Sequence, residues 1–121
     1  MQAKLLKNSK GFTLVELLAV IVILGVIAAI AVPAIGGIIS NSKSDADTQS
    51  VLLIQSAAEL YAMDKDSDDI TSPLLLTVLT GAGFLKDTTY TQQSSGNAYV
   101  SVDMTYDAAK GWTAGTVNVA P

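Results

Sequence analysis

The feature that most constrains this chain is a run of 23 residues, 17–39, that contains no charged side chain. As an α-helix that rises about 1.5 Å per residue, the run is about 35 Å long, which is enough to cross a hydrocarbon core of about 30 Å. We therefore expect a single membrane span. Lys4, Lys7 and Lys10 precede the run, whereas residues 40–45, which contain one lysine and one aspartate, follow it. By the positive-inside rule, this asymmetry places the N-terminus in the cytoplasm and residues 40–121 outside.

Glu16 is a carboxylate at the front edge of the apolar run. An ionisable group in a membrane segment is costly and is by default a hypothesis of function. The alternative is a boundary carboxylate that reaches the lipid headgroups or favours the positive N-terminus of the helix, an effect of about 0.3–1 kcal/mol. The residues around Glu16 decide between the two interpretations.

The string GFTLVELLAVIVILGVIAAIAVP, residues 11–33, closely resembles the N-terminus of type IV pilins and of their competence-type pseudopilin relatives. The matching features are a short leader with lysines that ends in Gly11, then Phe12, then a glutamate one helical turn later. An unbroken apolar helix with Pro33 inside it follows. The chain is therefore similar to this family on a specific pattern rather than on hydrophobicity alone.

The resemblance implies a processing site. In this family a membrane aspartyl protease, the prepilin peptidase, cuts after the glycine and methylates the new N-terminal residue. Residues 1–11 would be the cleaved leader, and Phe12 would be the methylated mature N-terminus. Glu16 would then face the N-terminal ammonium of a neighbouring subunit. Such a pair at 4 Å is worth about 1 kcal/mol in bulk water and about 4 kcal/mol at an effective dielectric constant of 20, before desolvation. Pro33 would mark a region that loses helicity in the filament.

The apolar run also fits two alternatives to a pilin helix. A secretory signal peptide has an apolar region of about 7–15 residues that ends at an A-x-A-like site. This run has 23 residues and continues past the small residues 28–31, which disfavours a signal peptide. The second alternative is a membrane-anchored module that binds a solute or ion and never polymerises. Cleavage after Gly11 and filament formation discriminate a pilin from such a module.

Composition excludes several classes of function. Without the three leader lysines, four lysines remain against eleven acidic residues, a side-chain charge of −7, which discourages nonspecific binding of nucleic acid. The chain has neither cysteine nor histidine. Thiol chemistry, the usual zinc ligands and the commonest general base are therefore missing. No nucleophile–base pair is evident, and we predict no enzyme and no cofactor.

Beyond residue 39 the pattern changes from uniformly apolar to amphipathic. Four apolar residues recur at spacings of 3, 4 and 3: Val51, Ile54, Ala58 and Tyr61. This period is typical of a helix that covers a core on one side. We therefore expect the span, residues 12–39, to continue as an amphipathic helix over residues 40–63. Residues 64–121 would then form a small globular head that packing alone stabilises.

Within the head, Ser72 and Pro73 predict the N-cap and first position of a short helix over residues 74–79. From residue 98 onward the apolar period falls to two, at Val100, Val102, Met104 and Tyr106. This period predicts a half-buried strand, and a turn at residues 107–111 leads to a partner strand over residues 112–119. Trp112 or the valine face of that strand would seal the core. Residues 88–93 are a candidate third strand.

The predicted fold class is therefore α+β. A long N-terminal α-helix, membrane-spanning in its first half and amphipathic in its second, packs against a small C-terminal head. The head contains a short helix and a two- to three-stranded antiparallel sheet.

Asp64, Asp66 and Asp68 have the spacing that begins an EF-hand calcium loop. Asp69 stands where that loop requires glycine, and Leu75 stands where it requires the bidentate glutamate. We therefore predict a solvated loop that ends the helix and no metal site. Type II secretion pseudopilins bind calcium beside an Asp-Pro-Trp-Gly-like segment, and this chain has no such segment.

The prediction from the whole sequence is a structural subunit, the major one, of a type IV pilus or pseudopilus. The precursor would be a single-pass protein of the cytoplasmic membrane with its N-terminus inside. The implied partners are the prepilin peptidase, the assembly platform with its ATPase, minor pilins and further copies of the chain itself. The product would be a helical homopolymer at the cell surface, and DNA is a candidate partner of that fibre.

Overall fold

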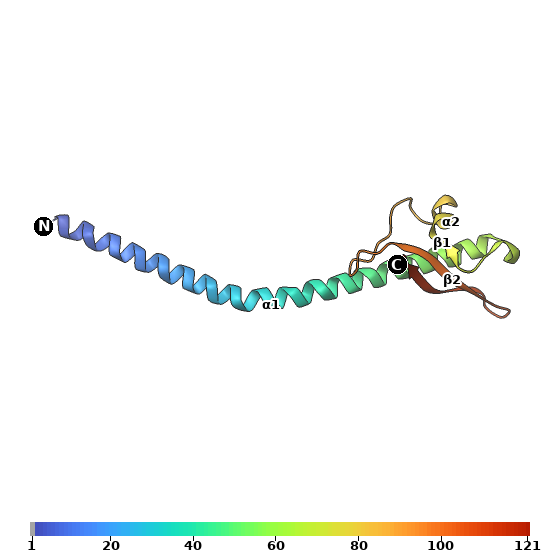
Figure 1. The fold of residues 1–121 in the computed structure, drawn as a ribbon, viewed down its shortest axis with the longest axis horizontal. Helices are drawn as coiled ribbons and strands as arrows, with labels where there is room; N and C mark the ends of the chain where they lie inside the picture. Colours follow the sequence, from blue (N-terminus) through green and yellow to red (C-terminus); the bar gives the residue numbers. More distant parts are fainter. Residues whose placement is uncertain (1) are drawn as a thin grey trace. The chain divides into compact units, whose positions relative to one another are not determined.

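The computed structural model describes the backbone of residues 2–121 and the side chains of residues 13–121. The chain divides into two compact units, residues 1–39 and residues 40–121. Helix α1, Gln2–Asp64, supplies the whole described part of the first unit and the first element of the second (Figure 1). It ends one residue beyond the expected position.

The first unit is an apolar helix whose described side chains lie on the surface. Leu14 is 70% exposed, Ile30 is 72% exposed, and Ala31 is the only described residue of this unit that is partly buried. Pro33 lies inside the helix, which continues beyond it. A monomeric soluble protein rarely exposes so much contiguous apolar surface, so this segment requires lipid or other helices around it.

In the second unit, one face of α1 forms part of the hydrophobic core. The buried residues on this face are Ile54, Ala57, Ala58, Tyr61 and Ala62. Val51 is partly buried and packs against the same cluster. Ile54, Ala58 and Tyr61 belong to the predicted apolar face, so the 3.6-residue period identified the core side correctly.

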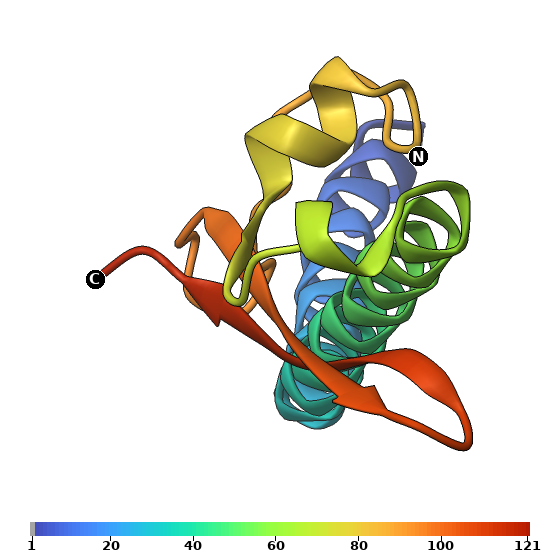
Figure 2. The same cartoon turned by 90° about the vertical axis from the view of Figure 1, so that its right-hand side faces the viewer.

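A three-stranded antiparallel sheet of strand order β1-β2-β3 covers this face. Its strands are β1 (Leu74–Leu75), β2 (Tyr99–Asp107) and β3 (Gly111–Val119). The β2–β3 hairpin lies against the second part of α1 (Figure 2). The predicted α+β class is confirmed.

The third strand comes from a different segment than expected. We predicted residues 88–93, but only Thr91 forms an isolated bridge there, to Ala98. β1 takes the place beside β2 instead, and Leu74 pairs with Val102. The physical reason is burial, because Leu74 is 2% exposed, whereas residues 88–93 are threonine, glutamine and a single tyrosine.

The short helix α2 spans Leu76–Gly81 and starts two residues later than predicted. Leu75 occupies the N-cap position without a side-chain hydrogen bond, so Ser72 does not cap this helix. The Ser72 hydroxyl instead accepts a hydrogen bond from the backbone N–H of Met104 at 3.0 Å. Pairing of Leu74 and Leu75 with β2 removes these residues from the helix, which is why the capping prediction was wrong.

The alternation along β2 also differs from the prediction. Val102 and Met104 are buried as expected, but Tyr106 is 56% exposed. At the start of the strand, Tyr99 is buried and Val100 is exposed, the reverse of the predicted pattern. The register of β2 against β3 shifts between Tyr99 and Ser101 and again between Val102 and Met104. Such irregularities change which face a side chain occupies, and a sequence period cannot locate them.

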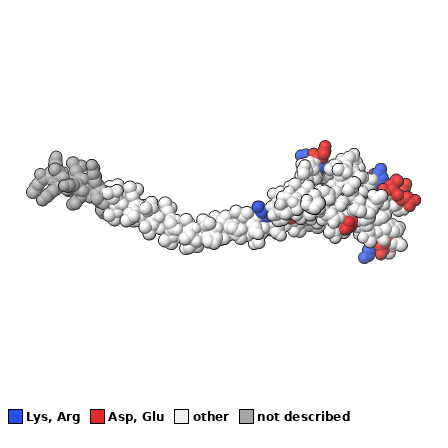
Figure 3. Space-filling model, in the orientation of Figure 1, with Lys and Arg blue, Asp and Glu red and all other residues white. Residues whose placement is uncertain are grey.

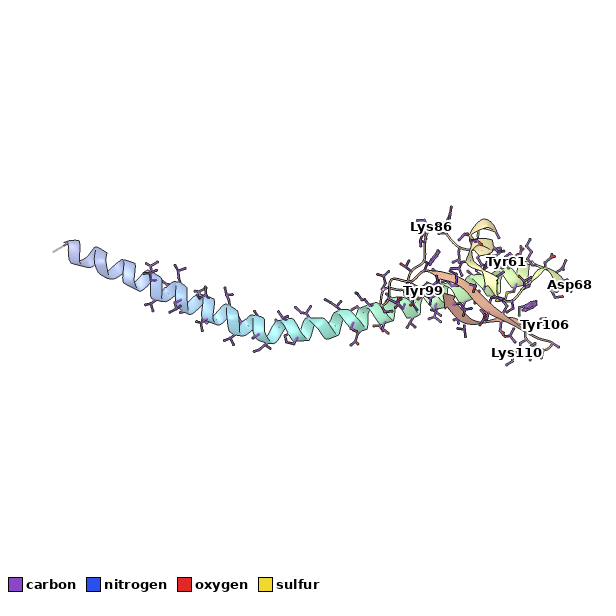
Figure 4. The ribbon with its side chains drawn as sticks, viewed as in Figure 1. Tyr61, Asp68, Lys86, Tyr99, Tyr106 and Lys110 are labelled. Atoms are coloured by element: carbon purple, nitrogen blue, oxygen red, sulfur yellow. The ribbon has the colours of Figure 1, made fainter. Side chains whose placement is uncertain are left out.

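The hairpin turn at residues 107–111 forms where it was predicted. Asp107 accepts hydrogen bonds on Oδ1 from the backbone N–H groups of Ala109 and Lys110. Gly111 has φ of 79°, a conformation that favours glycine. Tyr106 and Lys110 lie together at the tip of the hairpin (Figure 4). Trp112 is partly buried and packs against the core, as do the valines of β3.

Candidate functional site

The predicted assembly site lies at the start of α1. Gly11 and Phe12 belong to the helical backbone, but their side chains lie outside the described residues. Glu16 is described and is exposed. Phe12 and Glu16 are four positions apart in the continuous backbone of α1. No hydrogen bond or ion pair joins the Glu16 carboxylate to any described residue.

Residues 17–39 follow this carboxylate as an uncharged, solvent-accessible helix. From Thr13 to Asp64 the helix is long and apolar enough, by length and composition, to cross a membrane. In Figure 3, the white segment that leads up to the first blue side chain shows neither blue nor red atoms on its visible face. The described part of the site thus consists of one carboxylate at the edge of a long apolar helix.

The acidic loop after α1 forms a solvated helix end. Ser67–Asp69 make one turn of 3-10 helix, and the backbone N–H of Asp69 donates to the carbonyl oxygen of Asp66 at 3.0 Å. All of residues 63–69 are exposed. Within residues 13–121, no three carboxylate, imidazole or thiol groups converge in a way that could hold a metal ion.

Asp47 was not singled out in the sequence analysis. Its carboxylate accepts hydrogen bonds from the backbone N–H groups of Gln93 and Ser94 and from the Ser94 hydroxyl. The pKa of Asp47 is lowered, mainly by the hydrogen bond from the Ser94 hydroxyl. Desolvation raises the pKa by a smaller amount than this hydrogen bond lowers it, and the two backbone amides and Lys43 lower it further. The sequence offers only an aspartate in a helix and a Ser-Ser-Gly-Asn loop as signs of this contact. The two are 46 or more residues apart.

Two more polar residues of α1 form hydrogen bonds with backbone groups of β3. The side-chain amide of Gln55 donates to the carbonyl oxygen of Gly115 at 2.7 Å. Four residues later on the same helix, the Glu59 carboxylate accepts from the N–H of Ala114 at 3.3 Å. These contacts cover backbone groups of a sheet edge that would otherwise be open to another strand.

The N-terminal segment matches a known family. Residues 6–32 match the family model of the prokaryotic N-terminal methylation motif. This range contains Gly11, Phe12 and Glu16. This match supports the predicted resemblance to the type IV pilin-like family.

Curated relatives of this chain agree with the motif. The chain is 33% identical over 78 residues to the type II secretion system core protein G of Klebsiella michiganensis. The aligned region covers 61% of this chain and 52% of the relative. It is 38% identical over 63 residues to core protein G of Pectobacterium carotovorum, covering 49% and 38% of the two chains. Core protein G of Klebsiella pneumoniae is also 38% identical over 63 residues, covering 49% and 42%.

The chain thus spans about half the length of these relatives or less. No solved structure matches the chain. The apolar N-terminal helix and the methylation motif together indicate anchoring in a membrane.

Proposed function

We propose that this chain is a structural subunit, the major one, of a type IV pilus or pseudopilus filament. The observation that carries the proposal is the methylation motif over residues 6–32, which continues into an exposed apolar helix. Similarity to three type II secretion core proteins G favours the pseudopilus over the type IV pilus. The proposal assigns no catalytic role to the chain.

The proposed life of the subunit has three steps. The precursor inserts through residues 17–39 with its lysine-bearing N-terminus in the cytoplasm. Prepilin peptidase then cuts between Gly11 and Phe12 and methylates the new N-terminus. An assembly platform and its ATPase extract the mature subunit into a helical homopolymer, in which residues 12–39 form the core and residues 64–121 form the outer head.

Glu16 has a defined task in this proposal. Removal of the leader creates an ammonium group on Phe12, and Glu16 is the single acidic residue among positions 1–44. Pairing across two subunits would neutralise both charges in an apolar filament core, where an unpaired charge is strongly unfavourable. The geometry of this ion pair would then fix the axial register of each new subunit. Pro33 also lies inside α1 and would be the point where the helix loses helicity when the subunits pack.

The second candidate function is a membrane-anchored binding module that does not polymerise. A polar cavity in the second unit favours this alternative. The test is to shear surface fibres from cells that express the chain, image them, and determine the N-terminal mass of the fibre protein. Fibres built from a chain that starts at methylated Phe12 support the filament proposal. A chain that stays in the membrane, is uncut and is absent from sheared material supports the binding module.

A further inference from the structure

A cavity of about 340 Å³ lies in the second unit between α2 and the loop that leads to β2. Two core residues, Leu76 and Tyr99, line it and are 7% and 5% exposed. Figure 4 labels Tyr99 and also Lys86, the residue directly before the part of the loop that lines the cavity. The volume is at the small end of the range of about 300–1,000 Å³ found for ligand sites.

Backbone hydrogen bonds hold the walls of the cavity in place. The N–H groups of Phe84 and Leu85 both donate to the carbonyl oxygen of Leu79, which fixes the chain where it leaves α2. At the other end of the loop, the N–H of Tyr99 donates to the carbonyl oxygen of Tyr90 at 2.8 Å. The buried side chain of Leu85 anchors the start of the loop. The cavity is therefore bounded at both ends by the folded core.

The lining is rich in hydroxyl groups. Four threonines contribute to it: Thr77, Thr80, Thr88 and Thr89. Thr80 donates its hydroxyl to the carbonyl oxygen of Thr77 at 3.1 Å and keeps acceptor capacity. Among the described residues, the other three hydroxyls and the carboxylate of Asp87 have no hydrogen-bond partner in the protein. Several groups that can donate and accept thus converge on one space without internal partners.

The charges of the lining select the class of ligand. Asp87 is the one charged residue in it, and no lysine lines the cavity. An anion such as a phosphate or a carboxylate would be repelled by Asp87 and by the acidic chain as a whole. One carboxylate is too few for a calcium site, and the chain has no histidine or cysteine for softer metals. A neutral molecule that presents several hydroxyl groups matches the lining.

We propose that this cavity binds a single sugar ring or a similar small neutral polyol. The threonine hydroxyls and Asp87 would take the hydroxyl groups of the ligand, and the aromatic face of Tyr90 or Tyr99 would pack against its C–H groups. The source is either a free monosaccharide or the terminal residue of a longer glycan, and both present the same chemistry. Binding at this site does not require filament formation.

The test is NMR titration of the isotope-labelled full chain in a phosphocholine detergent, because detergents with sugar headgroups would compete. Glucose, galactose, N-acetylglucosamine and glycerol are the probes, with inorganic phosphate as the anion. A ligand of this size binds weakly, so the titration extends to about 50 mM. We expect saturable shift changes at the amides of residues 76–80 and 87–90 with at least one sugar and none with phosphate. A matched oligosaccharide that binds at least about tenfold more tightly than its free terminal sugar would identify a glycan as the source. Equal affinities would identify the free monosaccharide.

Two variants and one control locate the site. Thr89→Val removes one hydroxyl at constant shape, and Asp87→Ala removes the carboxylate. Each should weaken binding about tenfold while the remaining spectrum stays unchanged. Thr116→Val, an exposed threonine outside the cavity, should bind like the unmodified chain. Any of four results would overturn the proposal: no sugar-dependent shift changes, shift changes outside the cavity, equal binding by all variants, or a preference for phosphate.

Discussion

Asp47 on α1 and Ser94 in the loop before β2 form a two-point contact. The Oδ2 atom of Asp47 accepts from the Ser94 hydroxyl at 2.5 Å and from the Ser94 N–H at 3.1 Å. The contact joins residues 47 positions apart. It attaches the loop over residues 92–97 to the helix at a point well before the buried face of α1 begins.

The first prediction is that Asp47→Asn detaches this loop. The variant keeps the shape but loses the charge that strengthens all three hydrogen bonds. The amides of Gln93 and Ser94 should exchange their hydrogens faster, by about tenfold or more, while the amides of residues 54–62 stay protected. Asp66→Asn is the matched control, because Asp66 is an exposed aspartate whose side chain makes no capping hydrogen bond. Unchanged exchange at Ser94 would show that the contact does not hold the loop in solution.

The second prediction concerns pH. Because the pKa of Asp47 is lowered in the folded state, its contribution to stability is fully present above the ordinary value of 3.8. This contribution is lost as the pH falls through the lower folded pKa. The melting temperature of the full chain in detergent should therefore decrease between about pH 4 and pH 2 more steeply than that of Asp47→Asn. Parallel curves for both proteins would contradict the shift.

The third prediction compares two neighbouring residues of α1. Ile54 is fully buried, whereas Leu53 is 52% exposed. Ile54→Ala leaves a cavity in the core and should lower the free energy of unfolding of the head by about 2–5 kcal/mol. Leu53→Ala should change it by less than about 0.5 kcal/mol, because surface substitutions have small effects. Denaturant unfolding of both variants, followed by tryptophan fluorescence of Trp112, measures the difference. Equal losses would mean that the core does not lie on the Ile54 side.

Strong local patterns made much of this molecule predictable. The length of α1, its buried face and the turn at Asp107 follow from hydrophobic period and turn chemistry, which neighbouring residues determine. The errors share a different cause. Leu74 joins the sheet because Val102, far away in sequence, offers a buried pairing position, and no local signal reports that. Asp47 likewise meets Ser94 only after the chain has folded back.

The fourth prediction concerns processing. Glycine at the cut site lets the backbone enter a protease cleft without a side chain. Gly11→Leu should therefore accumulate as an uncut precursor in the membrane fraction, detected by its larger intact mass. The unmodified fibre protein should begin at methylated Phe12. Gly25→Leu is the control, since Gly25 has no neighbouring atom within 4 Å of an added Cβ and lies beyond the proposed cut. A mature chain that begins at Met1 or after Ala31 would disprove the proposed cut between Gly11 and Phe12.

The fifth prediction concerns assembly and rests on Glu16. Glu16→Ala keeps a span long enough to insert and removes a charge that is costly in lipid, so the precursor should be as abundant and as well trimmed as the unmodified chain. It loses the carboxylate that meets the Phe12 ammonium of a neighbour, and with it the attraction that sets subunit register. Glu16→Gln should fail nearly as badly, because it keeps the shape without the charge.

Shearing fibres from cells and comparing surface with membrane pools separates assembly from insertion. Both Glu16 variants should leave trimmed subunit in the membrane and little at the surface. Ser40→Ala, an exposed polar residue just after the apolar run, serves as the control and should assemble normally. If Glu16→Ala builds fibres at the level of the unmodified chain, Glu16 is a passive residue at the membrane boundary with no role in assembly. Charge pairing would then not set the register, and packing of the apolar helix alone would have to drive assembly.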